Sequence, residues 1–200
     1  MDTLTAIATR RSTRVYKPEQ ISDSQLQTVL AAGWASPVGH GAYDELYISV
    51  VQNPKILENF AEYCGQAFGN PKYNPFYGAP TLIVISAKPK DDGQMVYIAD
   101  VGCILENMQL AATDIGLGSV YLWALLNRIP QSPQFVASLE LPEGFKPVSA
   151  LAFFNHFNPI SPTPSNPPGR VLGFQIPALN TLTSESFNSC AIFKTCSSVS

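Results

Sequence analysis

Residues Met95–Ser119 read MVYIADVGCILENMQLAATDIGLGS, and this stretch decides the fold. Its apolar and small residues recur at spacings of three and four, the period of an amphipathic helix. They are Ile98, Val101, Gly102, Leu105, Met108, Gln109 and Ala112. Gly116 is the natural stop, because glycine readily adopts the left-handed conformation that ends many helices. We therefore predict a long helix over Met95–Ile115 and, beyond it, a strand over Val120–Leu125.

The other elements lie on both sides of this helix. Ser22-Asp23-Ser24-Gln25 has the spacing of a capping box and predicts a helix that Pro37 ends. Asn53-Pro54 is an N-cap and first-turn pair for a helix to about Phe68. The remaining predictions are short helices at Thr3–Arg10 and Ser132–Leu139 and strands at Leu46–Val51, Pro80–Ile85 and Val148–Phe154. Four strands and about five helices without regular β-α alternation predict an α+β fold, a sheet covered by helices.

The composition and periodicity of the sequence change after Asn155. Six of the seventeen prolines fall between Pro159 and Pro177, and no helical or strand period follows. We predict one domain over residues 1–158 and an extended, proline-rich arm over residues 159–200 that is not a second domain. The arm has too few charges for a solvated coil, so we expect it to lie over another subunit. Its candidate anchors are Phe174, Ile176, Leu179 and Phe187.

The composition excludes several classes of partner. Apolar residues make up 46% of the chain and charged residues 14%, enough to fill a core beneath a thinly charged surface. The net charge of -3 gives no electrostatic footprint for nucleic acid or an anionic membrane. No apolar run reaches the roughly 18 residues of a membrane span. We therefore expect neither nucleic acid nor a membrane as a partner.

The cysteines and the first residues bear on the cellular compartment. Cys64, Cys103, Cys190 and Cys196 show no CxxC spacing, which argues against zinc or an iron–sulfur cluster. We expect reduced thiols, with Cys64 and Cys103 packed as small apolar residues. The first residues show no basic stretch followed by an apolar one, as a secretory signal would. These features predict a cytoplasmic protein without a bound metal.

Arg10-Arg11-Ser12-Thr13-Arg14 is the first candidate for chemistry. Three guanidinium groups and a hydroxyl within five residues can hold a phosphate through charge-assisted hydrogen bonds. Alternatively, Arg10 and Arg11 only complement the negative end of the preceding helix.

Two loops are the other candidates. Pro37-Val38-Gly39-His40-Gly41 has two glycines that would let the backbone approach a flat ligand, or it is a plain helix–strand connection. Gly116-Leu117-Gly118-Ser119 leads to Tyr121 and Trp123, which share one strand face. These two rings would either form one side of a site for a planar cofactor or pack in the core. No motif typical of hydrolases occurs, and we expect no catalytic side chain of that kind.

The order of these pieces resembles the nitroreductase family of FMN-dependent NAD(P)H oxidoreductases. The matching pieces are Arg10–Arg14, Ala35–His40, Ala79–Val84, Glu106–Ala112 and Gly116–Ser119, within residues 3–155. The resemblance implies a three-layer α+β sandwich whose mainly antiparallel sheet is flanked by helices. It also implies a homodimer formed through long helices, with two FMN sites built from both chains.

The resemblance also implies roles for particular residues. Arg10, Arg11, Ser12 and Arg14 would bind the phosphate and ribityl chain of FMN. The edge of the flavin ring would be lined by Pro37, Val38 and His40, and its other face would be supported by Tyr121, Leu122, Trp123 and Ala124. Arg170, in Pro167-Pro168-Gly169-Arg170, would close the phosphate site.

The implied activity belongs mostly to the cofactor. NADH or NADPH would reduce FMN at N5, and the flavin would reduce an electron-poor acceptor such as a nitroaromatic, a quinone or an enone. Two alternatives stay open. One is a specialised enzyme on the same scaffold, dehalogenating or flavin-cleaving. The other is a non-enzymatic FMN-binding or interaction protein.

Overall fold

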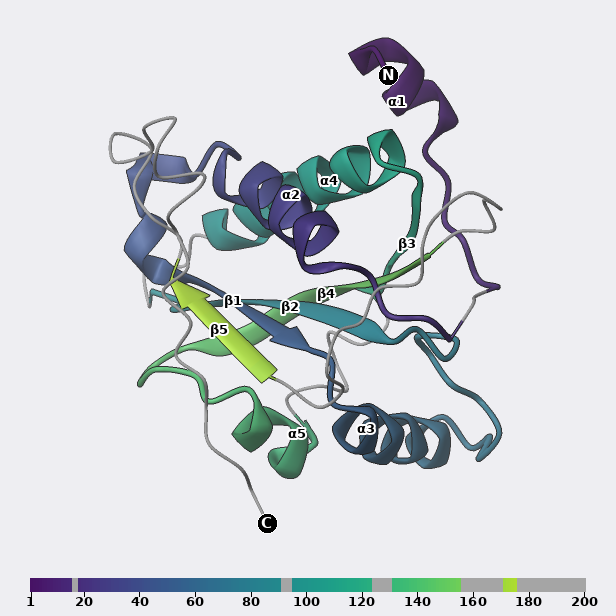
Figure 1. The fold of residues 1–200 in the computed structure, drawn as a ribbon. Helices are drawn as coiled ribbons and strands as arrows, with labels where there is room; N and C mark the ends of the chain where they lie inside the picture. The colour runs from purple at the N-terminus through teal and green to yellow at the C-terminus, as the bar shows by residue number, and fades with distance from the viewer. Residues whose placement is uncertain (16–17, 91–94, 124–130, 156–170, 176–200) are drawn as a thin grey trace.

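The computed structural model describes residues 1–15, 18–90, 95–123, 131–155 and 171–175. One sheet lies between two layers of helices: α2 and α4 cover one face, and α3 and α5 cover the other (Figure 1). The helices are α1 (Thr3–Thr9), α2 (Asp23–Trp34), α3 (Pro54–Ala67), α4 (Val96–Asp114) and α5 (Pro133–Ser138), with 3-10 turns η1 (Gly39–Gly41) and η2 (Tyr43–Glu45). The predicted three-layer α+β sandwich is confirmed.

The sheet has five strands in the order β3-β4-β2-β1-β5, and all neighbouring pairs are antiparallel. The strands are β1 (Leu46–Val51), β2 (Thr81–Ala87), β3 (Leu117–Tyr121), β4 (Lys146–Asn155) and β5 (Val171–Gln175). Side chains alternate between the two faces, as the pleat requires. In β2, for example, Ile83 and Ile85 pack under α2 and α4, while Leu82 and Val84 pack on the side of α3.

Local signals in the sequence account for most element boundaries. Ser22 accepts from Gln25 N–H, and the Gln25 side chain accepts from Ser22 N–H, so the predicted capping box starts α2. Asn53 caps α3, and Gly116 follows α4 with a φ of +75°. These predictions are confirmed because each depends on contacts within a few residues.

The strand after α4 is misplaced in the sequence-based prediction. We expected Val120–Leu125, but β3 covers Leu117–Tyr121 and ends before Leu122. The strand begins immediately after Gly116, so Leu117, Gly118 and Ser119 belong to the strand rather than to a loop. Ala124 and Leu125 lie outside the described residues.

The expected count of four strands is also wrong, because β5 comes from the predicted arm. β5 pairs with β1 of the same chain, with Val171 opposite Val51. Leu172 is 3% exposed, and a Cβ at Gly173 would lie 2.1 Å from Tyr47 Oη. At least this part of the arm therefore adds a strand to the sheet of its own chain. The sequence did not predict this short strand, because prolines surround it and no strand period is visible. Ile176, Leu179 and Phe187 lie outside the described residues.

The two described cysteines differ from each other. Cys64 is buried, as expected, but Cys103 is exposed on α4 and does not pack as a core residue. In the described part of the chain, no helix has the length and apolar character needed to cross a membrane.

Candidate functional site

The segment after α1 lies beside the start of β3. Ser12 forms an isolated parallel bridge with Ser119, and Thr13 N–H donates to the Ser119 carbonyl at 3.0 Å. Figure 1 shows this segment descending from α1 past β3. Two motifs separated by about a hundred residues of sequence are thus brought together by backbone contacts.

A cavity of about 320 Å³ opens at this junction. Three predicted residues line it: Arg10, Ser12 and Tyr121. The rest of its lining comes from α4 and was not assigned to the site from the sequence: Gly102, Leu105, Glu106 and Gln109. The sequence offered one sign of this site: Gln109 is a polar residue among the buried apolar residues of α4.

Polar contacts tie this cavity together. Arg10 Nε lies 3.2 Å from Glu106 Oε1, and both side chains are partly exposed. Gln109, only 3% exposed, donates from Nε2 to Ser119 Oγ at 3.3 Å. The cavity therefore holds a cation, a carboxylate, a buried amide and hydroxyls within one small volume.

The other two arginines of the motif do not line this cavity. Arg11 is exposed. Arg14 donates from Nε to Tyr77 Oη at 3.2 Å, and its guanidinium carbon lies 5.9 Å from the centre of that ring. The predicted group of three arginines is therefore spread, with Arg10 at α4 and Arg14 at the loop before β2.

The residues at the end of β3 face different ways. Tyr121 packs partly against the core under α4, whereas Leu122 is buried in the core beside α3. Trp123 is 54% exposed and stacks on Tyr121, with ring centres 6.2 Å apart. Leu122 therefore lies on the other side of the sheet from the cavity, and Ala124 lies outside the described residues.

The Pro37–His40 loop contacts α4 at a separate place. Gly39 N–H donates to Asp100 Oδ1 at 2.8 Å, while His40 is exposed with a φ of +57°. A small cavity of about 100 Å³ there is lined by Gly39, His40, Asp100 and residues of neighbouring elements. Within one chain, this loop and the Arg10 cavity are two distinct sites.

Arg170 lies outside the described residues. Its neighbour Val171 starts β5, at the opposite edge of the sheet from β3. Four strand spacings of about 4.8 Å separate these edges.

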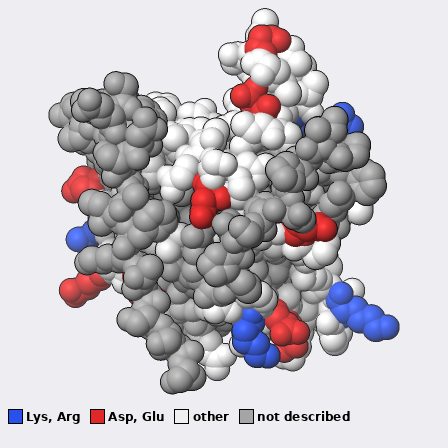
Figure 2. All heavy atoms as spheres, in the orientation of Figure 1, with Lys and Arg blue, Asp and Glu red and all other residues white. Residues whose placement is uncertain are grey.

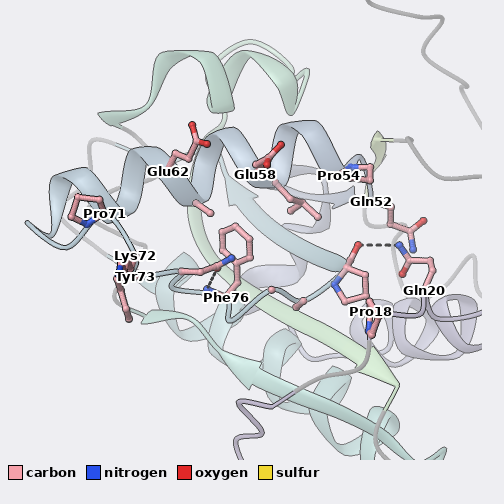
Figure 3. A pocket seen from close by; sticks show the side chains of 16 residues that line it. Pro18, Gln20, Gln52, Pro54, Glu58, Glu62, Pro71, Lys72, Tyr73 and Phe76 are labelled. Carbon is pink, nitrogen blue, oxygen red and sulfur yellow. Dashed lines mark hydrogen bonds between the residues drawn. The ribbon is translucent and has the colours of Figure 1, made fainter.

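A larger cavity of about 650 Å³ lies between α3 and the loop before β2 (Figure 3). None of the residues that line this cavity was predicted from the sequence to belong to a site. Its charged lining residues are Glu58, Glu62 and Lys72, a set that does not suit a phosphate. Burial raises the pKa of the Tyr73 phenol, with a smaller contribution from Tyr77, and keeps this lining residue neutral.

The outer surface is consistent with the low charge of the chain. On the face in Figure 2 the charged side chains are scattered, and those drawn form no basic patch. Of the three arginines in the predicted phosphate motif, Arg10 lines the cavity of about 320 Å³.

Comparisons with known proteins identify the family. The family model described as Nitroreductase matches residues 7–153. A nitroreductase from Bacteroides fragilis with bound FMN has a TM-score of 0.71 and 29% identity, covering 84% of this chain and 95% of that one. A nitroreductase from Desulfitobacterium hafniense, also with bound FMN, has a TM-score of 0.63 and 25% identity, with the same coverage of 84% and 95%.

Curated relatives are similar over shorter spans. A protein of Archaeoglobus fulgidus, provisionally named NADH dehydrogenase/NAD(P)H nitroreductase, is 34% identical over 121 residues, 60% of this chain and 66% of the relative. An NADPH-dependent oxidoreductase of Staphylococcus haemolyticus is 28% identical over 154 residues, 70% of this chain and 59% of the relative. The chain spans less than two thirds of the length of these relatives. The match of the family model over most of the described fold shows that the chain belongs to the nitroreductase family.

Proposed function

We propose that this protein binds FMN and works as an NAD(P)H-dependent reductase of electron-poor small molecules. The observation that carries the proposal is the Ser12–Ser119 contact, because it puts Arg10 and Tyr121 around one cavity beside α4. The two similar nitroreductases with bound FMN support the choice of cofactor.

The lining of the cavity fits one end of FMN. Arg10 and the Ser12 hydroxyl supply donors for the phosphate, and a guanidinium binds phosphate with matched geometry. Gly102 leaves room, since a Cβ added there would have no neighbour within 4 Å. The volume of about 320 Å³ is at the lower limit for a small-molecule site, which suits part of a cofactor better than all of it.

The rest of the site is proposed to come from a second copy of the chain. The Pro37–His40 loop contacts α4 through Gly39, and none of its residues lines the Arg10 cavity of the same chain. A homodimer formed through α4, where Ala99 and Cys103 are exposed, would bring one copy's loop to the other's cavity. Arg170, outside the described residues, stays the proposed basic residue that closes the phosphate site.

The protein's own residues would orient the cofactor and exclude water. When bound, FMN supplies hydride transfer from NADH or NADPH to an acceptor such as a nitroaromatic, a quinone or an enone. Arg10, Arg11, Ser12 and Arg14 would together hold the phosphate and ribityl chain, with Arg10 and Ser12 acting from the cavity. The stacked Tyr121 and Trp123 rings would form an apolar wall that limits access of water.

Absorbance and turnover of the purified protein test this proposal. We expect flavin bands, release of FMN on denaturation, and steady NAD(P)H oxidation with an added quinone. Flavin without turnover would instead favour the non-enzymatic binding protein. Turnover restricted to a halogenated substrate or to flavin itself would favour the specialised enzyme. A purified protein that takes up no added FMN would overturn the proposal.

A further inference from the structure

The Arg10 side chain has a specific partner on α4. Arg10 is the residue that ends α1, and its N–H donates to Ala6 O at 3.0 Å. Its guanidinium then spans to α4, where Nε lies 3.2 Å from Glu106 Oε1. Both residues line the cavity of about 320 Å³. The contact therefore joins a short, outlying helix to the longest described helix at the wall of the candidate phosphate site.

The geometry of this pair leaves the outer end of the guanidinium for an anion. A guanidinium has five N–H donors, one on Nε and four on the two terminal nitrogens. The ion pair with Glu106 is made at Nε, at 3.2 Å, and the terminal nitrogens are not part of it. An arginine side chain also loses much rotamer freedom when it binds a ligand, unless another contact already holds it. A carboxylate on Nε supplies such a contact.

Glu106 would also repel a phosphate by its charge. Its side chain is 50% exposed, however, and Arg10 is 30% exposed, so solvent and salt screen this repulsion. The Arg10–Glu106 ion pair is screened as well, but it joins two side chains in contact at 3.2 Å and so also restricts the rotamers of Arg10. The net effect of Glu106 on anion binding is therefore expected to be favourable.

We propose that Glu106 is a positioning residue that holds Arg10 in the conformation that binds the phosphate of FMN. This inference rests on the proposed function. It concerns the phosphate end only, so Glu106 should matter for FMN and not for riboflavin, which has the same ring without the phosphate. A residue that only supported the fold would affect both ligands alike.

The test is titration of FMN and of riboflavin into the apo forms of the full chain. The variants are Glu106→Ala, Glu106→Gln and the control Glu143→Ala, which removes an exposed carboxylate from a loop outside the cavity. We expect Glu106→Ala to weaken FMN binding by about two- to fivefold, the scale of an ion pair between partly exposed groups, and to leave riboflavin binding unchanged. Glu106→Gln keeps an acceptor for Nε and should lose less. The control should change neither affinity.

A double variant adds a second readout. Once Arg10→Ala has removed the guanidinium, Glu106→Ala should cause no further loss of FMN affinity. Unchanged or tighter FMN binding in Glu106→Ala would overturn the inference, as would equal losses for FMN and riboflavin. A wild-type protein that binds riboflavin as tightly as FMN would overturn the phosphate site of the proposed function itself, and the two failures are thereby distinguished.

Discussion

Two segments that carry proposed cofactor contacts, Arg10–Ser12 and Pro37–His40, both contact α4 but are held in different ways. Arg10 and Ser12 are fixed inside one chain, by Glu106 and by the backbone of Ser119. The Pro37–His40 loop is tied to α4 through Gly39 and Asp100, and it leaves His40 exposed. One segment borders a cavity of about 320 Å³ and the other a cavity of about 100 Å³.

This difference indicates how the FMN contacts would be divided between two chains. Asp100 and Glu106 are six residues apart on α4, about 9 Å along a helix at 1.5 Å per residue. The candidate phosphate contacts Arg10 and Ser12 are held within the chain, whereas the proposed ring-edge residues lie on a loop beside the described cavity of about 100 Å³. A second copy would supply the missing side of each site.

The largest effect should come from separating the two copies. Cys103 is exposed on α4, and in a two-fold dimer a residue near the axis lies close to its own copy. Cys103→Arg would then oppose like charges at a cost of several kcal/mol, which should weaken dimerisation by about a thousandfold or more. Sedimentation should show monomers, and absorbance should show loss of FMN. Gln66→Arg, on the exposed side of α3, is the matched control. Monomers that retain FMN would contradict the divided site.

The next effect concerns the phosphate end. Arg10→Ala should weaken FMN binding by about 1.5 to 3 kcal/mol, the range for hydrogen bonds to a charged group. Calorimetric titration of the apo-variant measures this. Lys55→Ala on α3 is the control, because it removes an exposed cation outside the cavity. An affinity equal to that of the wild type would mean that the phosphate binds elsewhere.

A smaller effect is expected at Arg14. Its guanidinium is engaged by Tyr77 and does not line the Arg10 cavity. Arg14→Ala should therefore cost about 1 kcal/mol in FMN affinity, the net contribution of an ordinary hydrogen bond. Tyr77→Phe keeps the ring but removes the hydroxyl that accepts from Arg14, and should change the affinity by less. A loss as large as that of Arg10→Ala would show that Arg14 leaves Tyr77 to bind the cofactor.

The sequence predicted those parts of the fold that depend on nearby residues. The capping box at Ser22, the Asn53–Pro54 start and the Gly116 stop are read from short spacings, and all three are confirmed. The strand at Val171–Gln175 was not predicted, because its partner β1 lies more than a hundred residues away in the sequence and the segment itself shows no local period.

The candidate site was predictable only in part, for a similar reason. The motif order identified Arg10, Ser12 and Tyr121 as neighbours of one ligand, and the structure brings them to one cavity. Glu106 and Gln109 lie in a helix that the sequence predicts from its apolar stripe, and their place at the cavity appears only when α4 is positioned beside Arg10. Exposure of Cys103 likewise depends on which side of α4 the rest of the chain covers.

The central claim, one site made from two chains, is tested most directly by mixing two defective variants. One chain carries Arg10→Ala, and the other carries Pro37→Glu with His40→Glu, both at exposed positions. Each pure variant should bind little FMN. After unfolding and refolding an equal mixture, half of the dimers contain both chains, and each of these has one intact site. The divided site predicts recovery of about a quarter of the wild-type FMN content. An FMN content no higher than the average of the two pure variants would contradict it, because every site would then lie within a single chain.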